Sequence, residues 1–290
     1  VVIMADIGGG GVRVPMSSIK RISLGMVAFL AACGGVWNDP YPSAETGRNI
    51  LYTAFVERPK HLDPVQSYTE DEITFTAQIY EPPLQYHYLK RPYALEAATV
   101  QEVPAPRYYD VSRRPLPEDA EAERVAESVY ELRIKPGIRY QPHPAFALDA
   151  SGQPLYLGDG VAEGRQGIAD FPASSSRELV ADDYIYQIKR LAHPRLHSPI
   201  FGLMSDKIIG LKELGATLQN AAKDLPAGAW IDLEPYPLPG IEQVDRYTFR
   251  IRIKGKYPQF LYWLAMPFFA PVPRAVDRFG EGREVGRSEV

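Results

Sequence analysis

Residues 129–140 read VYELRIKPGIRY, and apolar side chains alternate in them with charged ones: Tyr130, Leu132 and Ile134 against Glu131, Arg133 and Lys135. Successive side chains of a β-strand point to opposite faces, so the alternation predicts a strand with one buried face. Pro136-Gly137 follows, and these residue types suit a type II turn. We expect the turn to lead the strand into a hairpin.

Two other segments are patterned as clearly. Residues 247–254 alternate in the same way and predict a second half-buried strand. Residues 182–191, DDYIYQIKRL, predict a helix, because acidic residues occupy the first turn, basic residues the last, and Pro194 lies just beyond the end. We expect one apolar face of this helix to lie against the core: Tyr184, Ile188 and Leu191.

The remaining patterns are weaker. Residues 50–56 are rich in β-branched and aromatic side chains and predict a strand, and residues 61–64 predict a turn. Residues 73–80 have helical spacing that ends at Pro82-Pro83, and we expect three side chains on one face: Ile73, Ala77 and Tyr80. Residues 118–127 predict a solvated surface helix with Glu123 and Glu127 on one face. Glycines between 148 and 167 indicate a surface loop.

Composition limits the possible functions. The chain has 290 residues, of which 45% are hydrophobic and 23% charged, so it is long enough to bury a core. Its formal net charge of -4 comes without a dense Lys/Arg stripe, which argues against nucleic acid or an anionic membrane as the main partner. The single cysteine, Cys33, excludes an intramolecular disulfide and a zinc knuckle.

The position of Cys33 suggests export. Lys20 and Arg21 precede the apolar run 22–30, which is too short to span a bilayer, and small residues follow it. We therefore expect residues 16–32 to be a signal peptide. The sequence LAAC at 30–33 resembles the lipobox of bacterial lipoproteins, in which the cysteine is acylated and anchors the protein in a membrane. The alternatives are a signal peptide without lipidation and a buried N-terminal helix with an incidental cysteine.

The flanks of the signal segment have their own patterns. Residues 1–15 contain four consecutive glycines and suit neither a signal nor a core, so we expect them to be translated upstream sequence before a start at Met16. Residues 33–48 are polar and broken by glycine and proline, as expected of a lipidated tether.

Catalytic and metal motifs are weak. His193 and His197 have the spacing of a helical zinc pair, but Pro194 lies between them and no glutamate follows His193, so a loop pair without a ligand role is expected. We expect no metal site. No G-x-S-x-G elbow occurs, and an acylated cysteine cannot act as a nucleophile, so an enzyme is not expected.

Six motifs follow one another in an order that resembles the family 5 extracellular solute-binding proteins, the peptide and oligopeptide receptors of ABC importers. They are HLDP at 61–64, IYEPPL at 79–84, RPY at 91–93 with Leu95, LRIKPGIRY at 132–140, ADD at 181–183 with IKRL at 188–191, and YPQF at 257–260 with PVPR at 271–274. The ordered set is far more specific than any one motif.

The resemblance implies an α/β fold of the periplasmic-binding-protein type, class II, with mixed sheets and flanking helices. Residues 49–280 would be the start of lobe I with its accessory domain, and residues 281–290 a tail unlike the family. Because family members run to 500 residues or more, we expect this chain to be an N-terminal fragment that binds peptide poorly or not at all.

The implied function is the capture of peptides in the cell envelope or periplasm, for delivery to the permease and ATPase subunits of an importer. The implied state is a monomer without cofactors, held at the membrane by its lipid. The same scaffold also carries nickel chelates, haem, sugars or opines, so these ligands stay open. A stand-alone envelope lipoprotein or an unrecognised hydrolase is the remaining alternative.

By carry-over from the family, residues 57–62 match a position that lines the ligand cleft. Glu57 could meet an ammonium terminus of a peptide and Arg58 a carboxylate terminus. The alternative is that both are ordinary solvated charges beside a turn. Three tyrosines nearby are expected to be core or rim residues and not pocket walls: Tyr80, Tyr86 and Tyr88.

Overall fold

The computed structural model describes residues 43–280, except 46, 51, 53, 55, 157–164, 166 and 227–228. The chain divides into two compact units, Val1–Ala54 and Phe55–Val290. The expected upstream sequence 1–15, signal peptide 16–32, lipidated Cys33 and tail 281–290 lie outside the described residues, as does the tether before residue 43. In the first unit a 3-10 turn, η1, spans Ser43–Glu45, and the Tyr52 hydroxyl donates to the Glu45 carboxylate.

A five-stranded antiparallel sheet organises the second unit, in the order β4-β3-β5-β7-β6. Its longest pairing joins β5 and β7 over seven residues each, from Glu127 opposite Lys254 to Arg133 opposite Thr248. Both strands predicted from alternation are therefore confirmed. The strands are β3 (Arg107–Tyr109), β4 (Pro115–Leu116), β5 (Glu127–Arg133), β6 (Ile241–Gln243) and β7 (Thr248–Lys254). A separate antiparallel hairpin joins β1 (Leu84–Tyr86) to β2 (Leu95–Ala97).

The two faces of the sheet differ as the alternation requires. Tyr130 and Phe249 lie on the apolar face and are fully buried. The ring of Tyr184 stacks on Phe249 at 5.3 Å between centroids, and the ring of Phe260 lies 5.1 Å from that of Tyr130. On the opposite face Glu131 accepts hydrogen bonds from three arginines: Arg107, Arg133 and Arg250. The core therefore lies on one side of the sheet.

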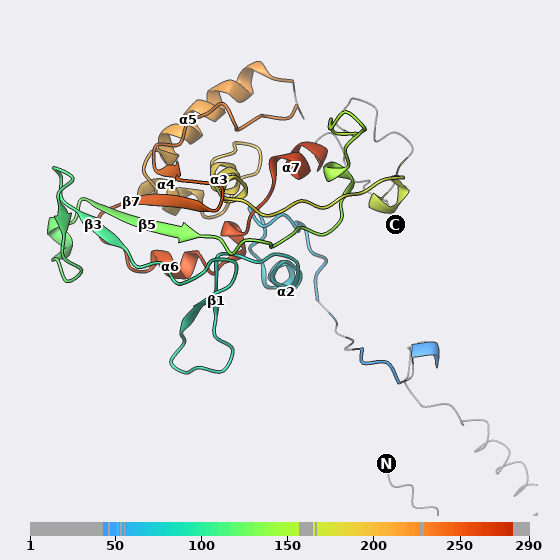
Figure 1. Cartoon of the computed structure of the whole chain (residues 1–290), viewed down its shortest axis with the longest axis horizontal. Helices are drawn as coiled ribbons and strands as arrows, with labels where there is room; N and C mark the ends of the chain where they lie inside the picture. The colour runs from blue at the N-terminus through green and yellow to red at the C-terminus, as the bar shows by residue number, and fades with distance from the viewer. Residues whose placement is uncertain are drawn as a thin grey trace, which may run out of the picture. The chain divides into compact units, whose positions relative to one another are not determined.

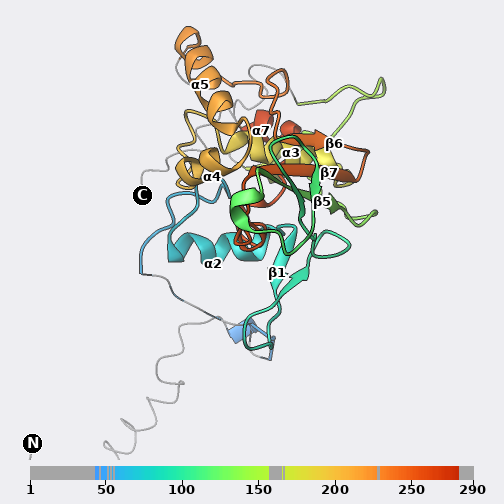
Figure 2. The same ribbon diagram turned by 90° about the vertical axis from the view of Figure 1, so that its left-hand side faces the viewer.

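Helices accompany the sheets. They are α2 (Glu70–Ile79), α3 (Ala181–Arg190), α4 (Phe201–Lys207), α5 (Leu211–Ala221), α6 (Phe260–Trp263) and α7 (Arg274–Gly280). Of these, α3 and α4 contact β7 directly. Single 3-10 turns are η2 (Ala122–Arg124), η3 (Pro144–Phe146), η4 (Ile168–Asp170), η5 (Ala222–Asp224) and η6 (Pro267–Phe269). Figures 1 and 2 show α3, α4 and α5 grouped together near β7. The α/β class with helices flanking sheets is confirmed, and every strand pair in the described residues is antiparallel.

The predicted helix at 182–191 is α3, and its expected core face is buried: Tyr184, Ile188 and Leu191. Within the described part of the chain, each helix is too short or too polar to cross a bilayer. The expected surface loop is confirmed where it is described, since residues 148–155 are exposed.

The hairpin expected after β5 is wrong. Gly137 has φ of +86°, as the predicted turn requires. The chain then leaves β5, and residues 138–140 pair with residues 177–179: the Leu179 N–H donates to the Ile138 carbonyl at 2.8 Å, and the Tyr140 N–H to the Arg177 carbonyl at 3.0 Å. The reason is that β3 and β7 already occupy both edges of β5.

The helix predicted at 73–80 is confirmed as α2, although Tyr80 lies just beyond its end. The buried side chains are polar, Glu72 and Thr76, whereas Ile73 is 36% exposed. The carboxylate of Glu72 accepts backbone N–H groups from residues outside the helix, among them His61 at 3.0 Å and Tyr68 at 2.9 Å. Those hydrogen bonds compensate the cost of burying a charged side chain. A hydrophobic pattern in the sequence does not predict them.

Two weaker predictions also fail. Residues 118–127 contain only the short turn η2, and Glu127 belongs to β5, where it pairs with Arg252. Pairing with the sheet outweighs the helical charge spacing there. In residues 50–56 none of the described positions lies in a strand, and three apolar side chains are exposed: Ile50, Tyr52 and Val56.

Candidate binding site

A cavity of about 490 Å³ lies where the end of α2, the segment 138–146 and the start of α7 meet. Its walls are mainly apolar and aromatic, with a few polar groups, which is the usual make-up of a small-ligand site. The residues that line it include Tyr80, Glu81, Arg139, Tyr140, Gln141 and Val272.

Local sequence explains each wall. Helix α2 stops at Ile79 because Tyr80 is extended and Pro82-Pro83 cannot continue a helix. Tyr80 then turns its half-buried ring to the cavity, and burial raises the pKa of its hydroxyl. Pro271 and Pro273 flank Val272 in the opposite wall, where proline fixes φ and leaves no backbone donor.

A buried ion-pair network holds these walls together. The Arg190 guanidinium on α3 contacts the Asp63 carboxylate at 2.5 Å and the Asp277 carboxylate at 2.8 Å. Asp63 lies in the turn before α2 and Asp277 on α7, so one side chain links α3 both to the chain before α2 and to α7. Burial disfavours the charge, but the two carboxylates outweigh it and raise the pKa of Arg190 above its usual range.

One wall of the cavity is an open backbone edge. In the ladder between residues 138–140 and 177–179, the bonded groups belong to Ile138 and Tyr140. The N–H and C=O groups of Arg139 and Gln141 therefore point away from that ladder. Among the described residues none of these four groups has a hydrogen-bond partner. The edge can accept an added extended strand.

The rim carries charges of both signs. Glu81 is exposed and forms no ion pair in the described chain. Arg139 donates to the Ser176 carbonyl at 2.7 Å, and no described carboxylate pairs with it. Beneath the rim the Arg177 guanidinium lies 5.3 Å from the Tyr140 ring centre and is ion-paired with Asp183. Burial, with Asp183 nearby, raises the pKa of Tyr140, so its hydroxyl is neutral.

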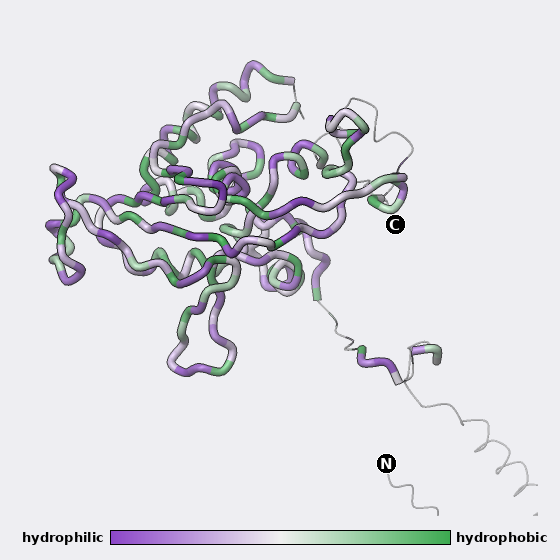
Figure 3. Tube along the Cα trace, in the orientation of Figure 1, coloured by the Kyte–Doolittle hydropathy of each residue, from purple (hydrophilic) through white to green (hydrophobic). Residues whose placement is uncertain are grey.

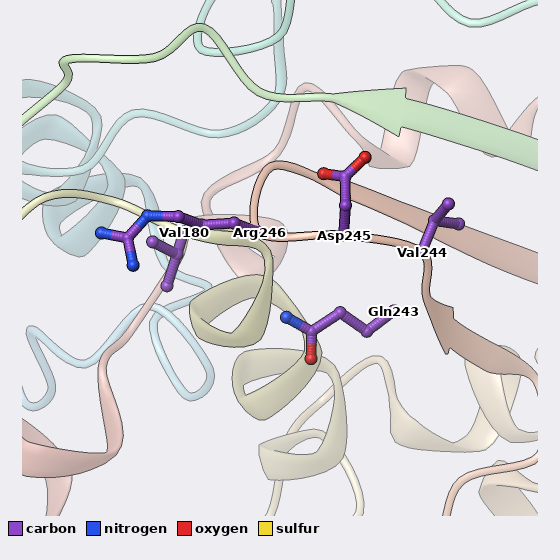
Figure 4. Close-up of a pocket in the computed structure, with 5 residues that line it drawn as sticks. All are labelled: Val180, Gln243, Val244, Asp245 and Arg246. Atoms are coloured by element: carbon purple, nitrogen blue, oxygen red, sulfur yellow. The ribbon is translucent and has the colours of Figure 1, made fainter.

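A second depression, of about 500 Å³, lies beside the start of α3 and the turn between β6 and β7 (Figure 4). Its charged groups already have partners. Arg246 pairs with Glu178 at 3.2 Å, and Asp245 accepts the Tyr247 N–H at 2.7 Å. It therefore offers a ligand less than the first cavity does.

Of the candidate residues chosen from the sequence, some line the cavity and others lie away from it. Glu57 and Arg58 are exposed in a bend before α2 and are absent from the lining of the cavity, so their ligand role stays a prediction. Tyr80 lines the cavity, which corrects its assignment to core or rim. Tyr86 and Tyr88 are exposed, on the β1–β2 hairpin.

The two histidines lie in the loop after α3, as predicted. His193 is buried and accepts the Arg195 N–H on Nδ1 at 3.2 Å, and burial lowers the pKa of His193 to about 4. The described residues contain no cluster of three His, Cys, Asp or Glu side chains placed to hold a metal.

Arg139 and Gln141 carry the open edge, and neither was singled out from the sequence. Which of their backbone groups is free depends on pairing with residues 177–179, almost 40 positions away. The turn at Pro136-Gly137 indicates that a new extended segment can begin just after it. It does not show which edge of that segment stays without a partner strand.

Comparisons with known proteins give a limited likeness. No family model matches the chain, and no curated protein matches it. Among solved structures, Listeria monocytogenes OppA bound to peptide is 15% identical with a TM-score of 0.40, covering 73% of this chain and 28% of that one. Helicobacter pylori DppA in complex with the peptide STSA is 15% identical with a TM-score of 0.42, covering 76% and 30%.

The Escherichia coli murein tripeptide binding protein MppA is 15% identical with a TM-score of 0.38, covering 76% of this chain and 30% of that one. The chain thus spans less than a third of the length of these solved structures. Likeness at this level does not assign a function.

Proposed function

We propose that the chain is part of the substrate-binding component of an ABC importer, related to the family 5 solute-binding proteins, and that its ligand is a peptide. The observation that carries the proposal is the open backbone edge at Arg139 and Gln141 along a mainly apolar cavity. The ordered motifs in residues 61–274 and the peptide-bound neighbours OppA and DppA agree with it.

The chemistry suits a peptide backbone. An extended peptide would exchange main-chain hydrogen bonds with Arg139 and Gln141 and would place one side chain in the cavity. Main-chain bonds are indifferent to sequence, and a cavity of about 490 Å³ admits varied side chains. Glu81 is placed to meet an ammonium terminus and Arg139 a carboxylate. Glu57 and Arg58 stay candidates for the same two roles further along the chain.

The test compares two substitutions at one position. Gln141→Pro removes the N–H that the peptide would use, in a residue whose N–H has no described partner, while Gln141→Ala keeps it. Titrations of the 290-residue chain with trialanine, followed by NMR, should give weak binding that Gln141→Pro lowers roughly 5- to 10-fold. Gln141→Ala should bind within about twofold of the parent.

Equal binding by the two variants would exclude the edge as the site. Binding of haem or a nickel chelate, with no response to any peptide, would exclude a peptide ligand.

We further propose that the protein is held in the cell envelope by acylation of Cys33, as a monomer that delivers its ligand to permease and ATPase subunits. The proposal rests on the sequence from Lys20 to Cys33. Labelling of cells with a palmitate analogue should mark the parent protein and leave Cys33→Ser unmarked. Label retained in Cys33→Ser would contradict lipidation at this residue.

A further inference from the structure

The β1–β2 hairpin extends from the rest of its unit in both views (Figures 1 and 2). Its connecting loop, residues 87–94, reads HYLKRPYA and contains no acidic residue. The largest apolar side chains of the loop are among the most exposed of the unit: Tyr88 is 87% exposed, Leu89 77% and Tyr93 66%. Figure 3 shows hydrophilic and hydrophobic residues side by side at this end.

The loop is held in one shape by its own polar groups. His87 accepts the backbone N–H of Leu89 at 3.2 Å and of Lys90 at 3.3 Å on Nδ1. Arg91 donates to the Lys90 carbonyl at 2.8 Å and lies 4.4 Å from the centre of the Tyr93 ring. Because these bonds order the backbone of the loop, they keep the side chains of Tyr88 and Leu89 exposed.

The base of the hairpin is also fixed. The Tyr86 ring stacks on Tyr262 at 6.2 Å and meets Tyr93 edge-on at 6.1 Å. Two cationic side chains follow in the loop. The Lys90 ammonium is exposed and has no partner among the described residues, and the Arg91 guanidinium donates hydrogen bonds only to carbonyl groups there. The tip therefore combines a tyrosine and a leucine with two unneutralised positive charges.

We propose that this hairpin tip contacts the surface of an anionic lipid bilayer, with Tyr88 and Leu89 entering the interface and Lys90 and Arg91 facing lipid phosphates. Tyrosine is favoured at the membrane–water interface because its ring is apolar and its hydroxyl polar. Basic side chains beside it are attracted by anionic headgroups. A projecting tip can reach a plane that the rest of the unit need not touch. The inference is independent of the peptide site.

The test places an environment-sensitive fluorophore, NBD, on a single cysteine of the full chain. Cys33→Ser removes the native thiol, and Leu89→Cys provides the labelled position. The control is Val111→Cys, because Val111 is 88% exposed in the β3–β4 turn. With vesicles containing phosphatidylglycerol, NBD at position 89 should shift to shorter wavelength and brighten, whereas NBD at position 111 should not change.

Two further variants test the chemistry. Lys90→Glu should raise the vesicle concentration for half-maximal response about 30-fold, because it changes two charge units near the headgroups. Lys212→Glu, at an exposed residue on α5, should leave it within about twofold. No response at position 89, an equal response at positions 89 and 111, or a response as strong with neutral phosphatidylcholine vesicles would overturn the proposal. A change of NBD fluorescence at position 89 that occurs only with an added protein, and not with vesicles, would also overturn the proposal.

Discussion

At the scale of single residues, two buried charges organise the parts of the structure around the cavity. Glu72 binds backbone N–H groups of residues 61, 68 and 69, and so fixes the chain before α2. Arg190 joins Asp63 to Asp277. Hydrophobic periodicity predicts neither role, because each depends on partners brought from elsewhere in the chain. Removing either charge leaves partners without compensation.

The first prediction concerns acid stability. Burial tends to raise the pKa of Glu72, but its backbone hydrogen bonds outweigh burial and lower the pKa from 4.5 to about 2. Because the folded pKa is the lower one, the stabilisation is complete above pH 4.5 and is lost as the pH falls toward 2. In urea unfolding, Glu72→Gln should have a lower free energy of unfolding than the parent at pH 7. Between pH 5 and pH 2.5 its free energy of unfolding should fall by less than that of the parent. Parallel losses in the two proteins would show that Glu72 does not titrate this way.

The second prediction concerns the ion-pair network. Arg190→Leu leaves the buried Asp277 carboxylate and the half-buried Asp63 carboxylate without their cation and should lower the free energy of unfolding by about 3–5 kcal/mol. The matched variant, Arg107→Leu, removes an exposed arginine from Glu131 and should cost less than about 1 kcal/mol. Urea denaturation at pH 7 measures both. Similar losses for the two variants would mean that the network does not tie the helices together.

At the scale of elements, the sequence predicts what depends on local order. Strong alternation at 129–135 and 247–253 predicted β5 and β7, and acids before bases predicted α3. The failures have a common physical cause. Residues 118–127 have helical charge spacing, but Glu127 begins strand β5 and forms an ion pair with Arg252 on β7. The turn at Gly137 was predicted correctly, but the partner of the next residues lies at 177–179.

The third prediction tests close packing between elements. A Cβ at Gly240 would lie 2.2 Å from the backbone oxygen of Ile209, so Gly240→Ala must move the main chain. We expect a loss of about 2 kcal/mol or more. A Cβ at Gly202, within α4, would meet nothing within 4 Å. Gly202→Ala should therefore be neutral or stabilise by about 0.5 kcal/mol. Thermal unfolding separates the two, and equal melting temperatures would refute the packing between Gly240 and Ile209.

At the scale of the whole molecule, the candidate site is built from segments that are distant in sequence. Tyr80, Gln141 and Val272 come from three parts of the chain and line one cavity. The ordered motifs of the sequence suggest a peptide ligand, and carry-over from the family puts the contacts at Glu57 and Arg58, which are absent from the lining of the cavity. The identity of a residue does not show whether its backbone N–H and C=O groups have partners. Arg139 and Gln141 could therefore be recognised only from the fold.

The central claim is that a peptide adds to the open edge at residues 139–141. Amide hydrogen exchange of the chain, with and without saturating trialanine, tests it most directly. The Tyr140 amide serves as an internal control, because it already donates to the Arg177 carbonyl. We expect the Arg139 and Gln141 amides to exchange rapidly in the free chain and to slow at least about tenfold with peptide, while Tyr140 changes little. Unchanged exchange at both residues, with the peptide bound, would contradict it.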